Sequence, residues 1–175
     1  MKKFIITLVI ALMPTLFFAQ SAFDKFDGQD NVTSVVVSKK MFEMMSKVEV
    51  DKKDKEAQQY LNLAKKLDNL KVFVTQNNKV SADMRSSVDK YLKSNALEEL
   101  MRVNDSGKNV KIYVKSGGST TQIKELLMFI EGGSAKGDDT VLMSLTGDFD
   151  INEISVLTKK MNLPGGEELK KAAKK

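Results

Sequence analysis

The chain has 175 residues, with 28 Lys and Arg against 23 Asp and Glu, a formal net charge of +5, and no Cys, His or Trp. Without Cys and His it lacks the side chains for disulfides, for thiolate or imidazole-assisted nucleophiles, and for zinc or copper sites built from nitrogen and sulfur. The excess of positive charge is too small to indicate a nucleic-acid-binding protein.

The first predicted element is an export signal at residues 1–19. Two lysines precede an apolar run, and the small residue Ala19 follows it, which is the pattern of a cleavable secretory signal peptide. We expect cleavage between Ala19 and Gln20, with cleavage after Ser21 as the alternative, because Phe17 is large for a position three residues before the cut. The run is shorter than the about twenty apolar residues that a membrane-spanning helix needs.

Three segments are expected after the signal. They are a polar leader at residues 20–31, a single domain at residues 32–163 and a basic tail at residues 164–175. Phe23 and Phe26 in the leader also have the spacing of two rings on a short helical turn. Because the chain has no cysteine to carry a lipid, we expect a periplasmic or secreted protein that is not lipid-anchored and makes no stable membrane insertion.

The domain begins with a strand and a methionine-rich helix. A β-branched run predicts a strand at residues 32–37, and Ser38 is a suitable residue to begin the helix. The apolar residues of this helix are Met41, Phe42, Met44, Met45 and Val48. Thioethers can bind copper(I), but no His or Cys supports such a site, so we expect the methionines to pack in the core.

Two further helices flank the next strand. Apolar residues at three- and four-residue spacings predict a helix at residues 54–67, and residues 70–75 alternate as a strand does. Asn77 and Asn78 indicate a turn, and Ser81 is the expected cap of the following helix. The apolar residues of that helix are Met84, Val88, Tyr91 and Leu92.

Two segments of the second half fit either a helix or a strand. Asn95 and Glu98 have the spacing of a helix capping box, but a strand at residues 99–104 would pair through a tight turn with the strictly alternating residues 110–115. Residues 123–130 fit a short helix or a buried strand. Elements of this kind together predict an α+β fold, an antiparallel β-meander sheet with helices packed on one face.

The last strand is predicted at residues 140–146, and Asp150 with Glu153 three residues later predicts the start of a final helix. The apolar residues of that helix are Ile154, Leu157 and Met161.

Three runs in the second half carry a family resemblance: ELMRVNDSGKNVKIYVKSGG, IKELLMFIEGG and VLMSLTGDFDINEI. They resemble the exported bacterial family called domain of unknown function 4252, over residues 32–163 and most strongly in LTGDFDI at residues 145–151. The resemblance implies strands at residues 99–104 and 123–130, and it implies no assigned activity and no catalytic residues. Many relatives carry a lipid anchor, from which this chain departs, and their association with envelope-stress control implies a sensing or accessory role.

The candidate functional residues are Gly147, Asp148, Asp150 and Glu153. Their acidic groups at alternate positions resemble the start of a calcium loop, but Glu153 stands where glycine is needed and Lys159 where the chelating glutamate should be. We therefore expect a structural turn in which Gly147 permits the bend and Asp150 caps a helix. The alternative is an enzyme that uses paired carboxylates on envelope glycan.

No other catalytic pattern is present, and no cofactor or metal is expected. The leading hypothesis is therefore an exported, non-catalytic binding or accessory module whose partner is an unidentified envelope protein or ligand. Only the tail at residues 164–175 has a marked local excess of one sign, with four Lys against two Glu, so weak contact with an anionic surface through the tail is a further alternative.

Overall fold

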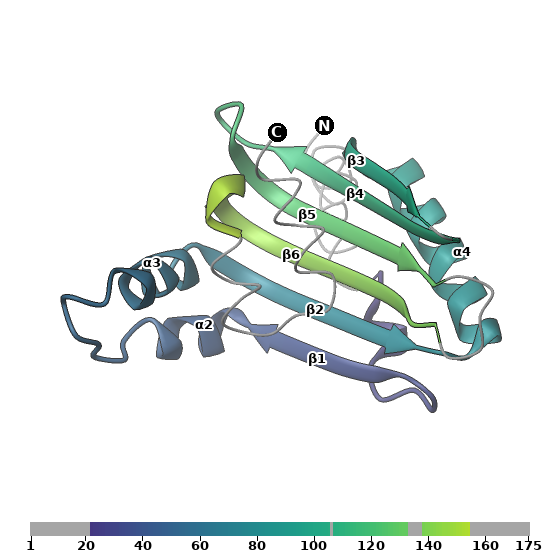
Figure 1. Ribbon diagram of the computed structural model, residues 1–175, viewed down its shortest axis with the longest axis horizontal. Coiled ribbons are helices and arrows are strands. Elements are labelled where there is room, and N and C mark those ends of the chain that lie inside the picture. The colour runs from purple at the N-terminus through teal and green to yellow at the C-terminus, as the bar shows by residue number, and fades with distance from the viewer. Residues whose placement is uncertain (1–21, 106, 133–137, 155–175) are drawn as a thin grey trace, which may run out of the picture.

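A computed structural model describes residues 22–105, 107–132 and 138–154 (Figure 1). The predicted signal with Ala19 and Gln20, the part of the final helix beyond Ile154 and the basic tail at residues 164–175 lie outside the described residues. Within the described ranges, the search for a helix with the length and apolar character of a membrane span finds none.

The described residues form a six-stranded antiparallel sheet with the strand order β1-β2-β6-β5-β4-β3. The strands are β1 (Thr33–Ser38), β2 (Leu67–Thr75), β3 (Glu98–Asp105), β4 (Lys108–Ser116), β5 (Gln122–Glu131) and β6 (Thr140–Asp150). The predicted α+β class is confirmed. Strands β3 to β6 follow one another as a meander, and β2 pairs with β6 so that β1 and β3 are the two edges.

Both segments that fitted either a helix or a strand are strands. Residues 99–104 lie in β3, which pairs with β4 from Glu98 opposite Val114 to Asp105 opposite Lys108. Residues 123–130 lie in β5, between β4 and β6. Pairing with neighbouring strands therefore outweighs the helix propensity of the Ala, Leu, Glu and Met residues in these segments.

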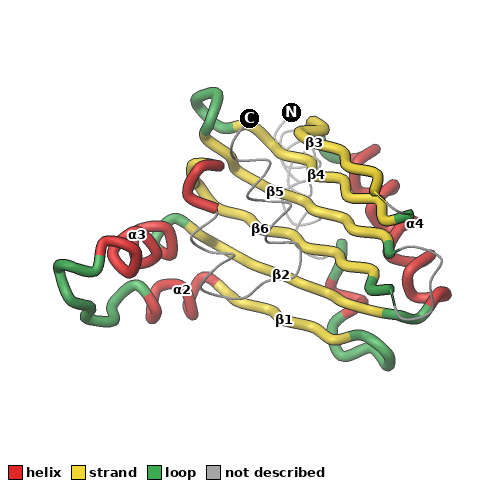
Figure 2. The backbone as a smooth tube through the Cα atoms, viewed as in Figure 1, coloured by secondary structure: helices red, strands yellow, loops and turns green. Residues whose placement is uncertain are grey.

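The helices lie in two places (Figure 2). They are α2 (Lys39–Met45), α3 (Lys55–Ala64) and α4 (Asn78–Ser94), with the 3₁₀ turns η1 (Asp24–Phe26) and η2 (Ile151–Glu153). Helix α4 lies across one face of the sheet, whereas α2 and α3, which connect β1 to β2, lie at one end of these strands (Figure 1).

The sheet separates two buried clusters because successive side chains of a strand point to opposite faces. On β5, Leu127 and Phe129 join the cluster beneath α4, while Leu126 and Met128 join the cluster on the other face. Phe42 of α2 and the end of α3 contribute to that second cluster. The central strands are therefore apolar on both faces, which explains why β5 lacks the alternating pattern of a half-exposed strand.

Residues before β1 are part of the packed structure. Phe23 and Phe26 are 3% and 0% exposed, and their ring centroids lie 5.0 Å from Tyr91 and 5.8 Å from Phe73 respectively. Of the two interpretations of this segment, the structure shows the helical turn that packs two rings. The packed chain thus extends to the N-terminal side of the domain boundary predicted at residue 32.

The predicted end of the second helix is wrong by three residues. Helix α3 ends at Ala64, and Leu67 already pairs with Gly147 of β6. The carbonyl of Lys66 accepts a hydrogen bond of 2.8 Å from the N–H of Asp148. This contact with a distant strand ends the helix, and the local apolar spacing does not reveal it.

The predicted start of the third helix is also wrong. Asn77 is the cap of α4, and its side chain accepts hydrogen bonds from the N–H groups of Lys79 and Val80. Ser81 lies inside the helix, where its hydroxyl lies 2.7 Å from the hydroxyl of Thr140. Both Asn77 and Ser81 are capping residue types, and the earlier one forms the cap.

The prediction that the α2 methionines pack in the core is wrong for Met41 and Met44. They are 45% and 52% exposed, and Val48 is 58% exposed. Helix α2 has only seven residues and lies at the end of the sheet, so that Phe42 is its one fully buried side chain. Helical spacing identifies an apolar face, but it does not say whether the protein's own core covers that face.

Candidate functional site

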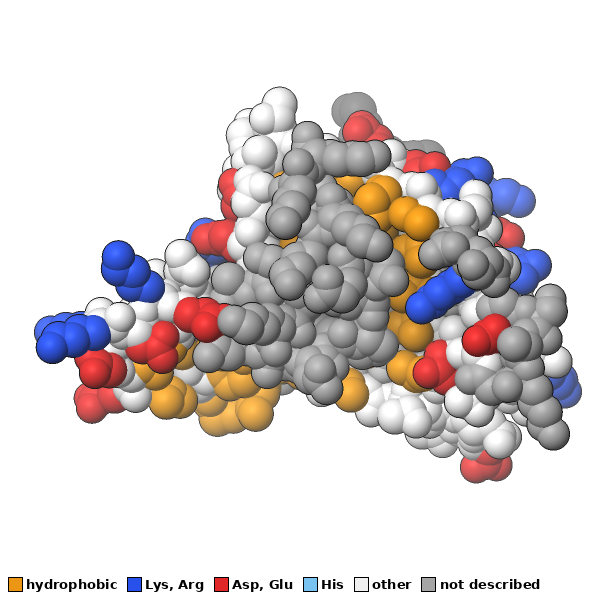
Figure 3. Space-filling view, in the orientation of Figure 1, with side chains coloured by type: hydrophobic (Ala, Val, Ile, Leu, Met, Phe, Trp, Pro, Cys, Tyr) orange, Lys and Arg blue, Asp and Glu red, His pale blue; other side chains and the backbone are white. Residues whose placement is uncertain are grey.

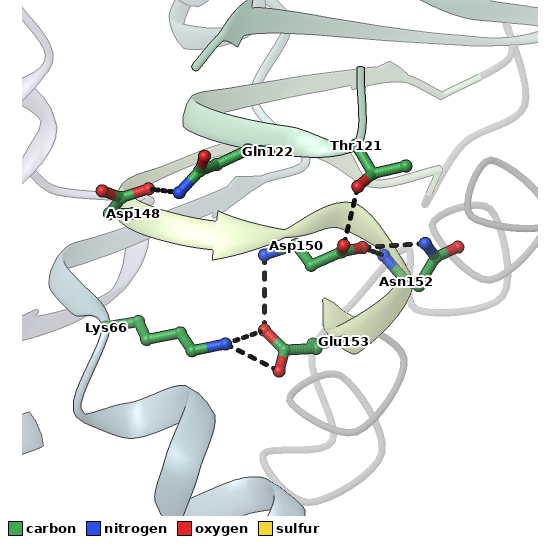
Figure 4. Close-up of polar contacts among 7 residues, drawn as sticks. All are labelled: Lys66, Thr121, Gln122, Asp148, Asp150, Asn152 and Glu153. Carbon is green, nitrogen blue, oxygen red and sulfur yellow. Dashed lines mark hydrogen bonds and ion pairs between the residues drawn. The ribbon is translucent and has the colours of Figure 1, made fainter. Parts of the chain in front are cut away.

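The predicted acidic turn lies where β6 ends and η2 begins (Figure 4). We use the name acidic turn for Gly147, Asp148, Asp150 and Glu153. The structure brings these residues against Lys66, which follows α3, and against the start of β5.

Gly147 allows two backbone segments to approach each other closely. A Cβ atom at this position would lie 2.3 Å from the carbonyl oxygen of Lys66 and 2.9 Å from the Cα atom of Leu67. Real Cβ atoms do not come so near to backbone atoms, so any other residue would force β2 and β6 apart. The sequence predicts that Gly147 permits a bend after the strand; the structure places it within β6, where the close approach of β2 is the reason for glycine.

Asp148 is held by two residues of β5. The ammonium group of Lys124 lies 2.5 Å from one carboxylate oxygen, and the side-chain amide of Gln122 donates to the other. The hydrogen bond from Lys124 is the main cause that holds the pKa of Asp148 below its ordinary value. This carboxylate is therefore charged and paired at neutral pH.

Asp150 caps η2, as its spacing to Glu153 predicts. Its carboxylate accepts hydrogen bonds from the N–H of Asn152 at 2.8 Å and from the hydroxyl of Thr121 at 2.7 Å. The bond from Asn152 is the largest cause of the lowered pKa of Asp150, followed by the bond from Thr121. Glu153 completes the capping box by accepting the N–H of Asp150 at 3.3 Å.

Glu153 also joins the turn to the residue that precedes β2, the neighbouring strand. Both of its carboxylate oxygens accept hydrogen bonds of 2.8 Å from the ammonium group of Lys66. Lys66 therefore holds the turn twice, through its side chain to Glu153 and through its carbonyl to Asp148 (Figure 4).

The geometry of the acidic turn favours a structural role. A glycoside-cleaving carboxyl acid needs a raised pKa, whereas Asp148 and Asp150 have lowered values and every carboxylate of the turn is already bound. In the part of the chain that the structure describes, no three Asp or Glu residues converge as metal ligands. These contacts count against acid catalysis and calcium binding at this turn.

A buried carboxyl that the sequence did not indicate lies elsewhere, beneath α4. Glu125 is 6% exposed, and the hydroxyl of Tyr91 donates a hydrogen bond of 2.7 Å to it. Burial is the largest cause that raises the pKa of Glu125, while the Tyr91 hydrogen bond and the charge of Lys115 act in the opposite direction. The only sequence signal for a buried Glu125 is its place in the apolar run at residues 123–130. Such a run does not show which residue contacts the carboxyl.

A hollow of about 530 Å³ lies at the other end of β6 from the acidic turn. It is lined by residues 31–33 and 74–77 and by Asp139. The hydroxyl of Thr75 donates to the carbonyl of Asn31 at 2.7 Å, and the amide of Gln76 donates to Asp139 at 2.9 Å. None of the predicted site residues lines it.

Exposed apolar side chains lie instead along β1, α2 and the turn after α2. We call this stretch the β1–α2 surface, and its residues are Val35, Val36, Met41, Met44 and Val48, which are 42%, 46%, 45%, 52% and 58% exposed. Val35 and Val36 are successive strand residues and therefore point to opposite faces of the sheet. Figure 3 shows hydrophobic side chains gathered over α2. The sequence signal for this surface is the methionine spacing, from which the expectation of core packing is wrong for Met41 and Met44.

Comparison with known proteins gives one match. The family model described as a domain of unknown function, DUF4252, matches residues 26–157, from η1 to beyond η2. Neither the curated proteins nor the solved structures include one that matches this chain. The matched span contains both the acidic turn and the β1–α2 surface.

Proposed function

We propose, from the premise that this chain belongs to the DUF4252 family, that it is an exported, non-catalytic module that binds a partner in the cell envelope through the β1–α2 surface. The observation that carries the proposal is the exposure of apolar side chains along an edge strand, along the helix that follows it and just beyond that helix. Export is proposed from the predicted signal at residues 1–19.

Physical chemistry supports a binding role for this surface. Apolar area left in water costs about 25 cal/mol per Å² relative to buried area, and contiguous exposed apolar patches are typical of interaction sites. Methionine side chains are flexible and polarizable, so that they adapt to the shape of a partner. The carboxylates of the acidic turn, in contrast, are all engaged in contacts within the chain.

The first test compares two exposed positions by photo-cross-linking in cells that produce the full chain. A cross-linking amino acid at Met44 is expected to give a discrete covalent adduct with a partner. Leu100 is the matched control, since it is an apolar residue, 41% exposed, on the opposite edge strand. Adducts of equal yield at both positions, or none at Met44, would contradict the proposal.

The second test concerns location. N-terminal sequencing of the protein recovered from the cell envelope or medium is expected to begin at Gln20, or at Ala22 if cleavage follows Ser21. A chain that keeps residues 1–19 would argue against a cleaved signal. Turnover of a peptide, ester, glycoside or phosphate substrate that is lost with a single side-chain change would overturn the non-catalytic role.

A further inference from the structure

Strand β1 has an open edge that lacks the usual protection. It pairs with β2 over six consecutive residues, from Thr33 opposite Val74 to Ser38 opposite Asn69, and no described strand pairs with its other side. The strand reads TSVVVS and has neither a charge nor a proline. Edge strands commonly carry such residues, which prevent pairing with another chain.

The opposite edge of the same sheet is protected. Strand β3 carries Glu98, Glu99 and Arg102, and the guanidinium of Arg102 lies 2.5 Å from the carboxylate of Glu99. Of the two edges, β1 is therefore the one suited to strand addition.

Charges of opposite sign flank the open strand. Asp27 and Asp30 precede β1, and Lys39 and Lys40 follow it. Asp30 and Lys40 are exposed, and the Nζ of Lys40 lies 3.8 Å from Glu43, a loose contact within the helix. When such a strand pairs antiparallel with an identical strand, each acidic start lies beside the basic end of the other.

We infer that the partner of the β1–α2 surface is a second copy of this chain, paired antiparallel through β1 so that the two sheets become continuous. The inference rests on the proposed function. Charge complementarity favours the antiparallel arrangement: a two-fold axis at Val35 places Val35 opposite its equivalent and brings the acidic residues before each β1 near the basic residues that follow the other. A parallel arrangement would bring charges of the same sign together.

The helices enlarge this interface. Helix α2 follows the end of β1, and the hollow lined by residues 31–33 and 74–77 lies at the start of β1. Antiparallel pairing therefore places α2 of each copy at the end of the interface where the hollow of the other lies. This added contact is needed because stable interfaces bury about 1,200–2,000 Å² in total, more than one six-residue edge supplies.

The first experiment uses the absence of cysteine in the chain. Val35→Cys places a single thiol at the two-fold axis, where directly opposite Cβ atoms are about 4.5–5.5 Å apart, so that a small shift brings them within the about 3.5–4.5 Å that a disulfide spans. The processed full chain with this substitution is expected to form a disulfide-linked dimer under mild oxidation. Leu100→Cys on the protected edge is the matched control and is expected to remain unlinked.

The second experiment exchanges the flanking charges. Sedimentation equilibrium of the processed chain is expected to show a dimer whose dissociation constant rises at least tenfold with Lys40→Glu and also with Asp30→Lys. The double variant is expected to recover most of the affinity, because the pair is restored with reversed signs. Circular dichroism confirms that each variant is folded.

The possible outcomes separate this inference from the proposed function. A monomer at all concentrations, or equal cross-linking through Leu100→Cys, would overturn the β1-paired dimer. If the photo-cross-linker at Met44 then still yields an adduct with a different envelope protein, the binding function stands and only the identity of the partner is wrong. If Met44 gives no adduct and the chain is monomeric, both are overturned.

Discussion

Single residues permit the close backbone contacts at the ends of the strands, and Gly147 is the clearest case. Gly147→Ala is expected to destabilise the fold by about 1–3 kcal/mol, because a Cβ atom 2.3 Å from the Lys66 carbonyl must push two backbones apart. The free energy of unfolding in urea, followed by circular dichroism, measures this loss.

The matched control for Gly147 is Gly118. A Cβ atom at Gly118 would meet its nearest neighbour, the side-chain oxygen of Gln122, at 3.4 Å, which is ordinary contact. Gly118→Ala is expected to change stability by no more than about 0.5 kcal/mol. Equal effects at the two glycines would show that close backbone approach is not the reason for Gly147.

Glu125 predicts an unusual dependence of stability on pH. Its pKa in the folded protein is above its ordinary value of 4.5, so the folded state holds a proton that the unfolded state releases in the window above pH 4.5. The contribution of Glu125 to stability is therefore greatest below pH 4.5 and is lost as the pH rises through the raised pKa. Asp148 and Asp150, with lowered pKa values, act oppositely and lose their contribution as the pH falls below 3.8.

Glu125→Gln isolates this effect, since glutamine keeps an acceptor for the Tyr91 hydroxyl and cannot ionise. Urea unfolding at a series of pH values is expected to show the variant more stable than the parent at neutral pH and equal to it below pH 4.5. Glu49→Gln, at an exposed position, is the control and should follow the parent at every pH. A constant difference between Glu125→Gln and the parent would rule out titration of Glu125 as the cause.

At the scale of elements, the start of α4 can be tested: the structure assigns Asn77 as its cap, whereas the sequence predicts Ser81. Asn77→Ala removes the acceptor of the Lys79 and Val80 N–H groups and is expected to cost about 1 kcal/mol. Thermal and urea unfolding measure the loss. Asn78→Ala changes the neighbouring exposed residue, which is already inside the helix, and is expected to stay within about 0.5 kcal/mol of the parent. A larger effect at Asn78 would contradict the assignment of the cap.

Local patterns predicted the elements whose signals are local. The capping box of Asp150 and Glu153 spans three residues, and the structure shows both of its hydrogen bonds. The partner Lys66 lies 87 residues from Glu153, and no spacing in the sequence connects the two. The cap at Asp150 was thus predicted, whereas the continuation of β6 through Gly147 and Asp148, beyond the strand predicted at residues 140–146, and the contact with Lys66 were not.

The methionines of α2 show a local pattern that does not by itself decide between two structures. Their helical spacing is the same for a core-facing stripe and for an exposed contact surface, and only the position of α2 at the end of β1 and β2 decides between them. Edge position is a property of the whole sheet order, so neither the open strand β1 nor the surface beside it can be read from residues 32–48 alone.

At the scale of the whole molecule, one sheet serves two apolar clusters, and no disulfide is available to hold them together. Neighbouring residues of β5 contribute to different clusters, with Met128 on one face and Phe129 beneath α4. The two clusters therefore share the same strands and cannot be lost independently without breaking strand pairing. This arrangement predicts a single cooperative unfolding transition.

Met128→Ala tests that cooperativity from the face opposite α4. The substitution is expected to destabilise the fold by about 2–5 kcal/mol, because it leaves a cavity at a fully buried position. Amide hydrogen exchange of the most protected residues in β2 and in α4 should report the same loss, although Met128 belongs to the other cluster. Leu100→Ala, at an exposed position, should leave both within about 0.5 kcal/mol of the parent. If α4 kept its protection while β2 lost it, the two faces would be separate folding units and the shared strands would not couple them.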